Sequence, residues 1–238
     1  MAEIQNIQYY SNTLDRNINL EVTGHWGYPI LLFPTSGGSY TQNTDFGLNQ
    51  SVIHFIEQGW IKIYNVETLD MLTFYDNQLS SELKIQRYEL FMKFLQRELI
   101  PYIKMQCNTE RIAVGGCSFG GYHAGNTAFR FPDLVSHLFS MSGVFNIRNF
   151  TPLSDDMAIY FNCPDEFMRN EEAWKYSHME IVLSTSDWDS CRTKNIHMSH
   201  VLNEKGIRHW YDEKKWIEHD WPLWKMVFPE YVERFFKT

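Results

Sequence analysis

Short apolar runs alternate with segments of helical spacing along most of this 238-residue chain. The runs Tyr28–Phe33 (YPILLF) and Trp60–Val66 (WIKIYNV) are typical of strands, and Ser51–Gln58 between them has the spacing of a helix that ends at Gly59. The same patterns predict further strands at Arg111–Gly115, His137–Val144 and Met179–Ser184, and helices at about Ser80–Met105, Phe119–Phe131, Thr193–Lys205 and Pro222–Phe236.

Strands that alternate with helices form βαβ units, which place the strands in a mostly parallel sheet with helices on both faces. The sequence therefore predicts an α/β fold. The alternation in NINLEV predicts antiparallel strands at one edge of the sheet, within the first twenty residues. No linker or repeat divides the chain. We expect residues 1–238 to form one domain, with the irregular stretch 145–178 as a small inserted cap over the site.

Composition excludes several classes of protein. A hydrophobic fraction of 44% predicts a packed core, and a formal net charge of −8 opposes binding to nucleic acid or to anionic membranes. The N-terminus MAEIQNIQYY lacks the pattern of a signal peptide, and no apolar run is long enough to span a bilayer. The four cysteines show no CxxC spacing. We therefore expect reduced thiols, no metal site, no nucleic-acid or membrane partner, and a cytoplasmic location.

The run GGCSFGG places Ser118 between a predicted strand and a predicted helix. In α/β hydrolases the nucleophilic serine occupies such a turn, where the backbone is strained and the neighbours must be small. Gly116 and Gly120 lie two residues on either side of Ser118, and Gly121 lets the helix pack close to the strand. The alternative is a glycine-rich turn in which the serine only caps the helix. Cys117 precedes the turn residue, so its side chain is expected to point into the fold.

The base is expected near the C-terminus, because this fold orders its triad as serine, acid and histidine. His219 follows the strand-like segment HWYDEKKW and precedes the last helix, so it is our candidate. The alternative for His219 is packing among the neighbouring tryptophans. His197 and His200 fall within a predicted helix, and no further ligand accompanies them and Cys191 at the spacing of a metal site.

The acid is expected in the loop that reads LSTSDWDSC. Asp187 and Asp189 both qualify, and we favour Asp189 because it lies deeper in the loop. Acyl transfer also needs backbone N–H donors for the oxyanion. We expect one donor from Phe119, the residue after the nucleophile. We expect the other from the run FPTSGG, at Thr35 or, as the less favoured choice, Ser36; the alternative for this run is an ordinary glycine turn.

Several stretches from Tyr28 onward carry a resemblance to known proteins: YPILLFPTSGG, RIAVGGCSFGGYHAGNTAFRFPDL, SMSGVFNI, IVLSTSDWD and HDWPLW. In these stretches the chain resembles the esterase D-type "putative esterase" family of the α/β-hydrolase superfamily, which includes feruloyl esterases, S-formylglutathione hydrolases and mycolyltransferases. The resemblance implies that GxSxGG carries the nucleophile, here Ser118, and that HDWxxW carries the base, here His219. It implies an acid in a GxxD-like turn, here Asp189 with Ser186 in place of the glycine.

We therefore expect a serine esterase that cleaves a small-molecule carboxylic ester through an acyl-enzyme on Ser118, without a cofactor. An acyltransferase would use the same triad with an alcohol in place of water. A catalytically silent binding protein of the same fold is the other alternative. Four aromatic residues fall near the expected site and either line a pocket or pack in the core: Tyr122, Trp188, Trp221 and Trp224.

Overall fold

The computed structural model describes residues 2–152 and 157–237. Its strands in these ranges are β1 (Ile4–Ser11), β2 (Arg16–Thr23), β3 (Tyr28–Phe33), β4 (Ile61–Val66), β5 (Ile112–Cys117), β6 (Val135–Met141), β7 (Glu180–Trp188) and β8 (Trp210–Glu218). They form one sheet in the order β1-β2-β4-β3-β5-β6-β7-β8. Strand β2 pairs antiparallel with β1 and β4, and the other neighbours are parallel. The mostly parallel sheet and its antiparallel edge strands are therefore as predicted.

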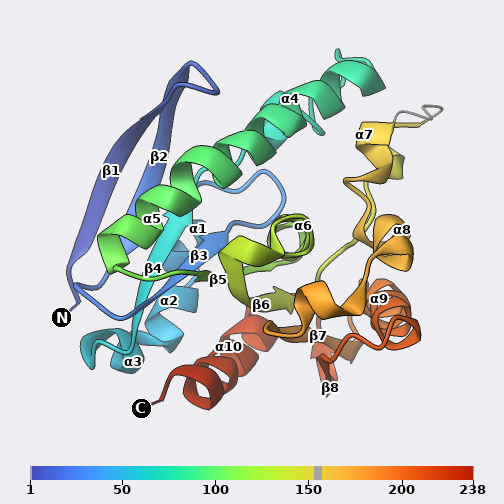
Figure 1. Ribbon diagram of the computed structural model, residues 1–238. Coiled ribbons are helices and arrows are strands. Elements are labelled where there is room, and N and C mark those ends of the chain that lie inside the picture. Colours follow the sequence, from blue (N-terminus) through green and yellow to red (C-terminus); the bar gives the residue numbers. More distant parts are fainter. Residues whose placement is uncertain (1, 153–156, 238) are drawn as a thin grey trace.

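Helices cover both faces of this sheet. They are α1 (Gln42–Asp45), α2 (Leu48–Ser51), α3 (Ile53–Glu57), α4 (Ser81–Phe94), α5 (Ile100–Cys107), α6 (Phe119–Arg130), α7 (Met157–Tyr160), α8 (Pro164–Phe167), α9 (Arg192–Glu204) and α10 (Trp221–Phe236). Buried side chains of α4, α5, α6 and α9 form one apolar cluster with the sheet, and those of α2, α3 and α10 form a second cluster. Figure 1 shows the long α4–α5 helix and α10 on opposite sides of the strands. None of the helices in the described ranges has the length and apolarity needed to cross a bilayer.

The predicted helix Ser80–Met105 is continuous but not uniform. The Ser80 hydroxyl caps it by accepting the Leu83 N–H, and a π-helical turn at Leu95–Leu99 joins α4 to α5. Proline has no N–H and its ring clashes with the carbonyl four residues earlier in a regular helix. The π turn precedes Pro101 and widens the helix where that clash would occur, so the chain continues through the proline.

The central strands position the site. All residues of β5 and all but the first of β3 are buried, which is typical of parallel strands covered on both faces. Helix α6 packs very close to the sheet, since a Cβ at Gly121 would lie 2.8 Å from the Cα of Gly143. Because parallel strands end at the same edge, the segments that follow β3, β5, β7 and β8 meet there.

The stretch predicted as a cap, 145–178, contains the short helices α7 and α8 and several 3₁₀ turns. It runs along one side of the molecule, shown in yellow and orange in Figure 1. Residues 153–156 of this stretch lie outside the described residues. Its assignment as a cap stays a prediction, as does the single domain.

Candidate active site

Ser118 lies on the sharp turn between β5 and α6 and has a strained backbone. Its φ is 56° and its ψ is −118°, outside the regions that residues with side chains favour. A Cβ at Gly116 would lie 2.5 Å from backbone atoms of Gly120, and a Cβ at Gly120 would lie 2.5 Å from the carbonyl oxygen of Phe33. Sterics therefore require both glycines, for the reason that the sequence suggested.

Three side chains from different strand ends form a hydrogen-bonded chain at this turn. His219 Nε2 lies 2.9 Å from Ser118 Oγ, and His219 Nδ1 lies 2.6 Å from Asp189 Oδ1. Ser118 follows β5, Asp189 follows β7 and His219 follows β8. Asp187, the alternative acid, faces elsewhere and accepts the Trp216 N–H at 2.7 Å. Of the two aspartates, only Asp189 contacts the histidine.

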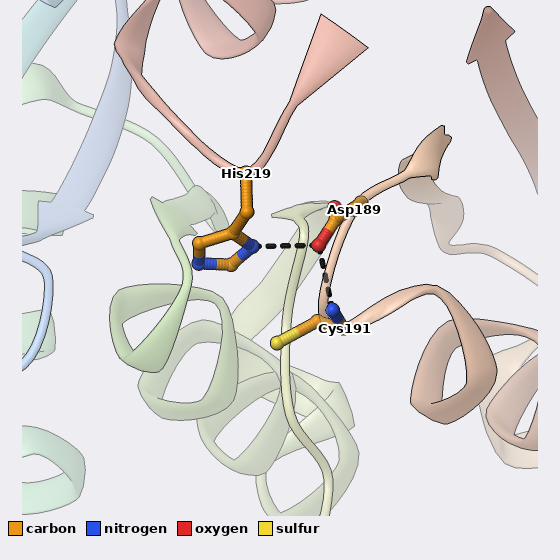
Figure 2. A group of neighbouring side chains, drawn as sticks. All are labelled: Asp189, Cys191 and His219. Atoms are coloured by element: carbon orange, nitrogen blue, oxygen red, sulfur yellow. Dashed lines mark hydrogen bonds and ion pairs between the residues drawn. The ribbon is translucent and has the colours of Figure 1, made fainter. Parts of the chain in front are cut away.

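Asp189 is almost fully buried, and both of its oxygens have donors. Besides His219, Oδ1 accepts the Cys191 N–H at 2.7 Å, and Oδ2 accepts the Thr185 hydroxyl at 2.9 Å. Figure 2 shows the carboxylate between the histidine ring and the Cys191 backbone. Burial disfavours the ionised form, but hydrogen bonds from His219, Ser142 and Cys191 outweigh it and hold the pKa of Asp189 below its ordinary value.

His219 is held from two sides. Burial favours its neutral form, but the hydrogen bond with Asp189 and the contact with Cys191 outweigh burial and raise the pKa of His219 above its ordinary value of 6.5. The Trp224 ring packs edge-on against the imidazole, with centroids 5.2 Å apart and an interplanar angle of 89°. Trp224 Nε1 donates in turn to Ser142 Oγ at 2.9 Å, and Ser142 has a positive φ of 55°. The imidazole is thus oriented by packing as well as by the carboxylate.

The PTSGG loop (34–38), where we expected the second oxyanion donor, follows β3. The Thr35 N–H, our preferred donor, donates to Gln42 Oε1 at 2.9 Å. Ser36 lines the cavity beside Ser118, whereas Thr35 does not. Within the described residues, no hydrogen bond engages the N–H of Ser36 or of Phe119. The geometry therefore differs from the expectation, because the Gln42 side chain folds back onto the loop and occupies the Thr35 amide.

A cavity of about 580 Å³ opens beside Ser118 and His219. Its lining combines aromatic side chains with polar ones, among them Tyr75, Phe119, Phe150, Asn146, Lys194 and His197. Neither Tyr122 nor the three tryptophans that the sequence placed near the site line it in the described structure. A larger cavity of about 830 Å³ lies elsewhere, beside Arg130 and Trp174, and Ser118 and His219 do not line it. Ser118 and His219 thus lie at the smaller of the two cavities.

One group of side chains in the described part of the chain could hold a metal ion. It consists of Asp189, Cys191 and His219, whose donor atoms lie within 4.8 Å of one another. Asp189 and His219 already bond to each other, and a protonated Nδ1 offers no lone pair to a metal. His197, considered with Cys191 as a ligand, instead lies 3.3 Å from Arg169 Nη2.

Sequence reasoning missed three residues that shape the site: Ser142, Thr185 and Gln42. Ser142 and Thr185 supply hydroxyls to the Asp189 carboxylate, and both lie at or near the ends of strands that flank the site. That position is a usable signal, since side chains at the carboxyl ends of parallel strands gather at one edge. Nothing in the sequence marks Gln42, because its contact with Thr35 depends on how the loop folds back.

The chain matches the model of a family described as "Putative esterase" over residues 33–234, a span that includes Ser118, Asp189 and His219. The chain belongs to this esterase family. It is a carboxylic ester hydrolase with the α/β-hydrolase fold. A search of curated proteins finds no match to this esterase.

Solved structures similar to this esterase share its fold at low sequence identity. A ferulic acid esterase is 17% identical, with a TM-score of 0.77 over 98% of this chain and 99% of that one. The fluorophosphonate-binding serine hydrolase F of Staphylococcus aureus, with substrate bound, is 13% identical, with a TM-score of 0.72 over 98% of each chain. MPT51 of Mycobacterium tuberculosis is 14% identical, with a TM-score of 0.78 over 100% of this chain and 99% of that one.

Proposed function

We propose that this esterase cleaves small-molecule carboxylic esters through an acyl-enzyme on Ser118, with His219 as general base and Asp189 as the acid that orients it. One observation carries the proposal: the hydrogen-bonded chain from Asp189 through His219 to Ser118 ends at a cavity of about 580 Å³. A strained serine with a base at 2.9 Å and an oriented carboxylate behind the base is the arrangement that nucleophilic acyl transfer needs.

The reaction proceeds in two steps. His219 Nε2 takes the Ser118 proton as the serine oxygen attacks the ester carbonyl carbon, and the imidazolium then gives that proton to the departing alcohol oxygen. A water molecule then attacks the acyl carbonyl carbon as His219 removes its proton, and a tetrahedral intermediate forms. When it collapses, the bond from the acyl carbon to Ser118 Oγ breaks, the imidazolium returns the proton to Oγ, and the carboxylic acid leaves. The Asp189 carboxylate stabilises the imidazolium in both steps, and the reaction requires no cofactor.

The oxyanion hole in this proposal consists of the N–H groups of Phe119 and Ser36. Both residues line the cavity beside Ser118, and both amides are available to a new acceptor. Phe119 is the first residue of α6, so its N–H belongs to the helix N-terminus, where the partial positive charge favours an anion.

The cavity supports an ester with one apolar or aromatic part. Tyr75, Phe119 and Phe150 form an aromatic wall next to the nucleophile, whereas Asn146 and Lys194 provide polar groups. Burying apolar surface of the ester against this wall contributes roughly 25 cal/mol per Å² of apolar area to the free energy of binding. We therefore expect aryl or branched acyl esters to be turned over faster than acetate esters.

A fluorophosphonate probe tests the proposal. The parent is expected to be labelled, whereas Ser118→Ala is not labelled and His219→Ala reacts at least 100-fold more slowly. Cys117→Ala is the matched control for the neighbouring thiol: Cys117 is fully buried, and burial raises the pKa of its thiol, so this variant should react like the parent. Equal labelling of Ser118→Ala and the parent would overturn the mechanism. Product analysis with an added alcohol separates hydrolysis from acyl transfer.

A further inference from the structure

A second histidine–aspartate pair lies sealed beneath the site. His123 Nε2 lies 2.8 Å from Asp70 Oδ1, and both side chains are only 1% exposed. The Tyr88 hydroxyl lies 3.0 Å from His123 Nδ1. No step of the proposed mechanism uses these three residues. Burying polar groups is costly unless they are well paired, so a buried pair with no catalytic task needs a structural explanation.

The protons of this group have one consistent arrangement. Burial raises the pKa of Tyr88, so its hydroxyl stays protonated and can donate to His123 Nδ1. With Nδ1 accepting, the ring proton lies on His123 Nε2, which donates to Asp70 Oδ1. The second oxygen, Asp70 Oδ2, accepts the Gly37 N–H at 3.0 Å. Each polar side-chain atom of Tyr88, His123 and Asp70 therefore has a partner, as does the Gly37 N–H.

This chain of hydrogen bonds joins the two elements that carry the proposed oxyanion donors. Gly37 directly follows Ser36 and has a φ of 61°, in a turn closed by the Gly38 N–H on the Thr35 carbonyl. At the other end, His123 lies one helical turn after Phe119 on α6, and the two rings meet edge to face with centroids 4.9 Å apart. Asp70 therefore contacts the PTSGG loop with one oxygen and the nucleophile helix with the other.

We propose that Asp70 and His123 are positioning residues that set the distance between the Ser36 and Phe119 N–H groups, and so hold the oxyanion hole in its reactive geometry. The inference rests on the proposed function. Its physical basis is that oxyanion donors stabilise the transition state only when they are fixed in advance at hydrogen-bond distance from the developing charge. The glycines of the PTSGG loop allow many backbone conformations, and the buried Asp70 carboxylate restricts them by accepting the Gly37 N–H.

The test uses the full-length chain and the double variant Asp70→Leu/His123→Leu. Removing both partners avoids leaving one buried charge unpaired, so the double variant is expected to fold. The double variant releases the PTSGG loop from its anchor. Its kcat for an aryl ester should fall about 10- to 100-fold, and its KM should stay within about twofold of the parent value. Affinity for a trifluoromethyl ketone, whose adduct with Ser118 places an oxyanion in the hole, should fall by the same factor. Asp212→Asn alters another buried carboxylate, which lies on β8 and bonds to Tyr231. Three strands separate β8 from β3, the strand that precedes the loop, so this variant should leave kcat unchanged.

A folded double variant with parental kcat and parental ketone affinity would overturn the proposal, as would a change confined to KM. If the double variant does not fold, Asp70→Asn takes its place: its neutral amide is a weaker acceptor for the Gly37 N–H, and ketone affinity should drop several-fold. Unchanged affinity in that folded variant would equally count against the anchor. Failure of the proposed function itself has another signature, which is full activity in Ser118→Ala.

Discussion

The substitution Asp189→Asn removes the negative charge next to His219 but can keep the hydrogen bond that orients the His219 ring. In the parent, Oδ1 accepts from both His219 Nδ1 and the Cys191 N–H, Oδ2 accepts the Thr185 hydroxyl, and the Ser142 hydroxyl also bonds to the carboxylate. An asparagine can keep its oxygen at the Oδ1 position and place its NH₂ group against Thr185, whose hydroxyl can rotate to accept. The histidine tautomer is then preserved, and the main loss is the negative charge.

The magnitude follows from that loss. When His219 takes the serine proton, it becomes an imidazolium next to a carboxylate that is 0% exposed. Two unit charges about 4 Å apart interact by about 4 kcal/mol at an effective dielectric constant of about 20. Since each 1.36 kcal/mol is tenfold in rate, kcat for Asp189→Asn should fall by about three decades.

Steady-state hydrolysis of an aryl ester measures this effect, and Asp187→Asn is the matched control. Asp187 holds the Trp216 N–H and does not contact the histidine, so its variant should stay within about threefold of the parent. Adding Thr185→Val to Asp189→Asn removes the acceptor for the NH₂ group and should deepen the loss, since the buried amide then lacks the contact that holds its orientation. A fall of less than tenfold in Asp189→Asn, or an equal fall in Asp187→Asn, would refute the reasoning.

Three further changes have defined outcomes. His219 must be neutral to act as a base, and its pKa is raised above 6.5, so kcat/KM should increase with pH through a pKa above that value. Asp189→Asn should move this rise in the pH–rate profile to lower pH. A rise at the parental pH in Asp189→Asn would contradict the assignment of His219 as the base. Gly120→Ala puts a Cβ 2.5 Å from the Phe33 and Pro34 carbonyl oxygens, so we expect at least a tenfold loss of kcat and a loss of about 1–3 kcal/mol in the free energy of unfolding by urea titration. Trp224→Phe removes the indole hydrogen bond to a hydroxyl at the site and should lower kcat several-fold with little change in KM, as measured by steady-state kinetics.

The fold was predictable because its signals are local. The apolar run Tyr28–Phe33 and the sequence GGCSFGG each predict a strand or a turn without knowledge of distant residues, and β3 and the turn at Ser118 lie where these signals place them. The long helix was harder, since the wide turn before Pro101 depends on hydrogen-bond geometry that residue spacing does not report.

The site was only partly predictable because it depends on contacts between loops. Choosing Asp189 over Asp187 required knowing which carboxylate points to the histidine at the end of β7, and two residues of separation give no strong signal for that. The preference for Thr35 as oxyanion donor overlooked Gln42, seven residues later, whose side chain occupies the Thr35 amide. Backbone donors leave no side-chain signature, so such details must come from structure.

The two histidine–aspartate pairs show why residue type alone does not identify a catalytic centre. In both, a hydroxyl faces one ring nitrogen and a carboxylate faces the other: Ser118–His219–Asp189 in one chain and Tyr88–His123–Asp70 in the other. Exposure distinguishes them, since the His219 side chain is 21% exposed at a cavity and the His123 side chain is 1% exposed. No ester can reach the sealed pair, and burial keeps the Tyr88 hydroxyl protonated by raising its pKa. Burial and access therefore support the two roles that we propose: proton transfer to substrate by the open pair, and positioning of two backbone segments by the sealed pair.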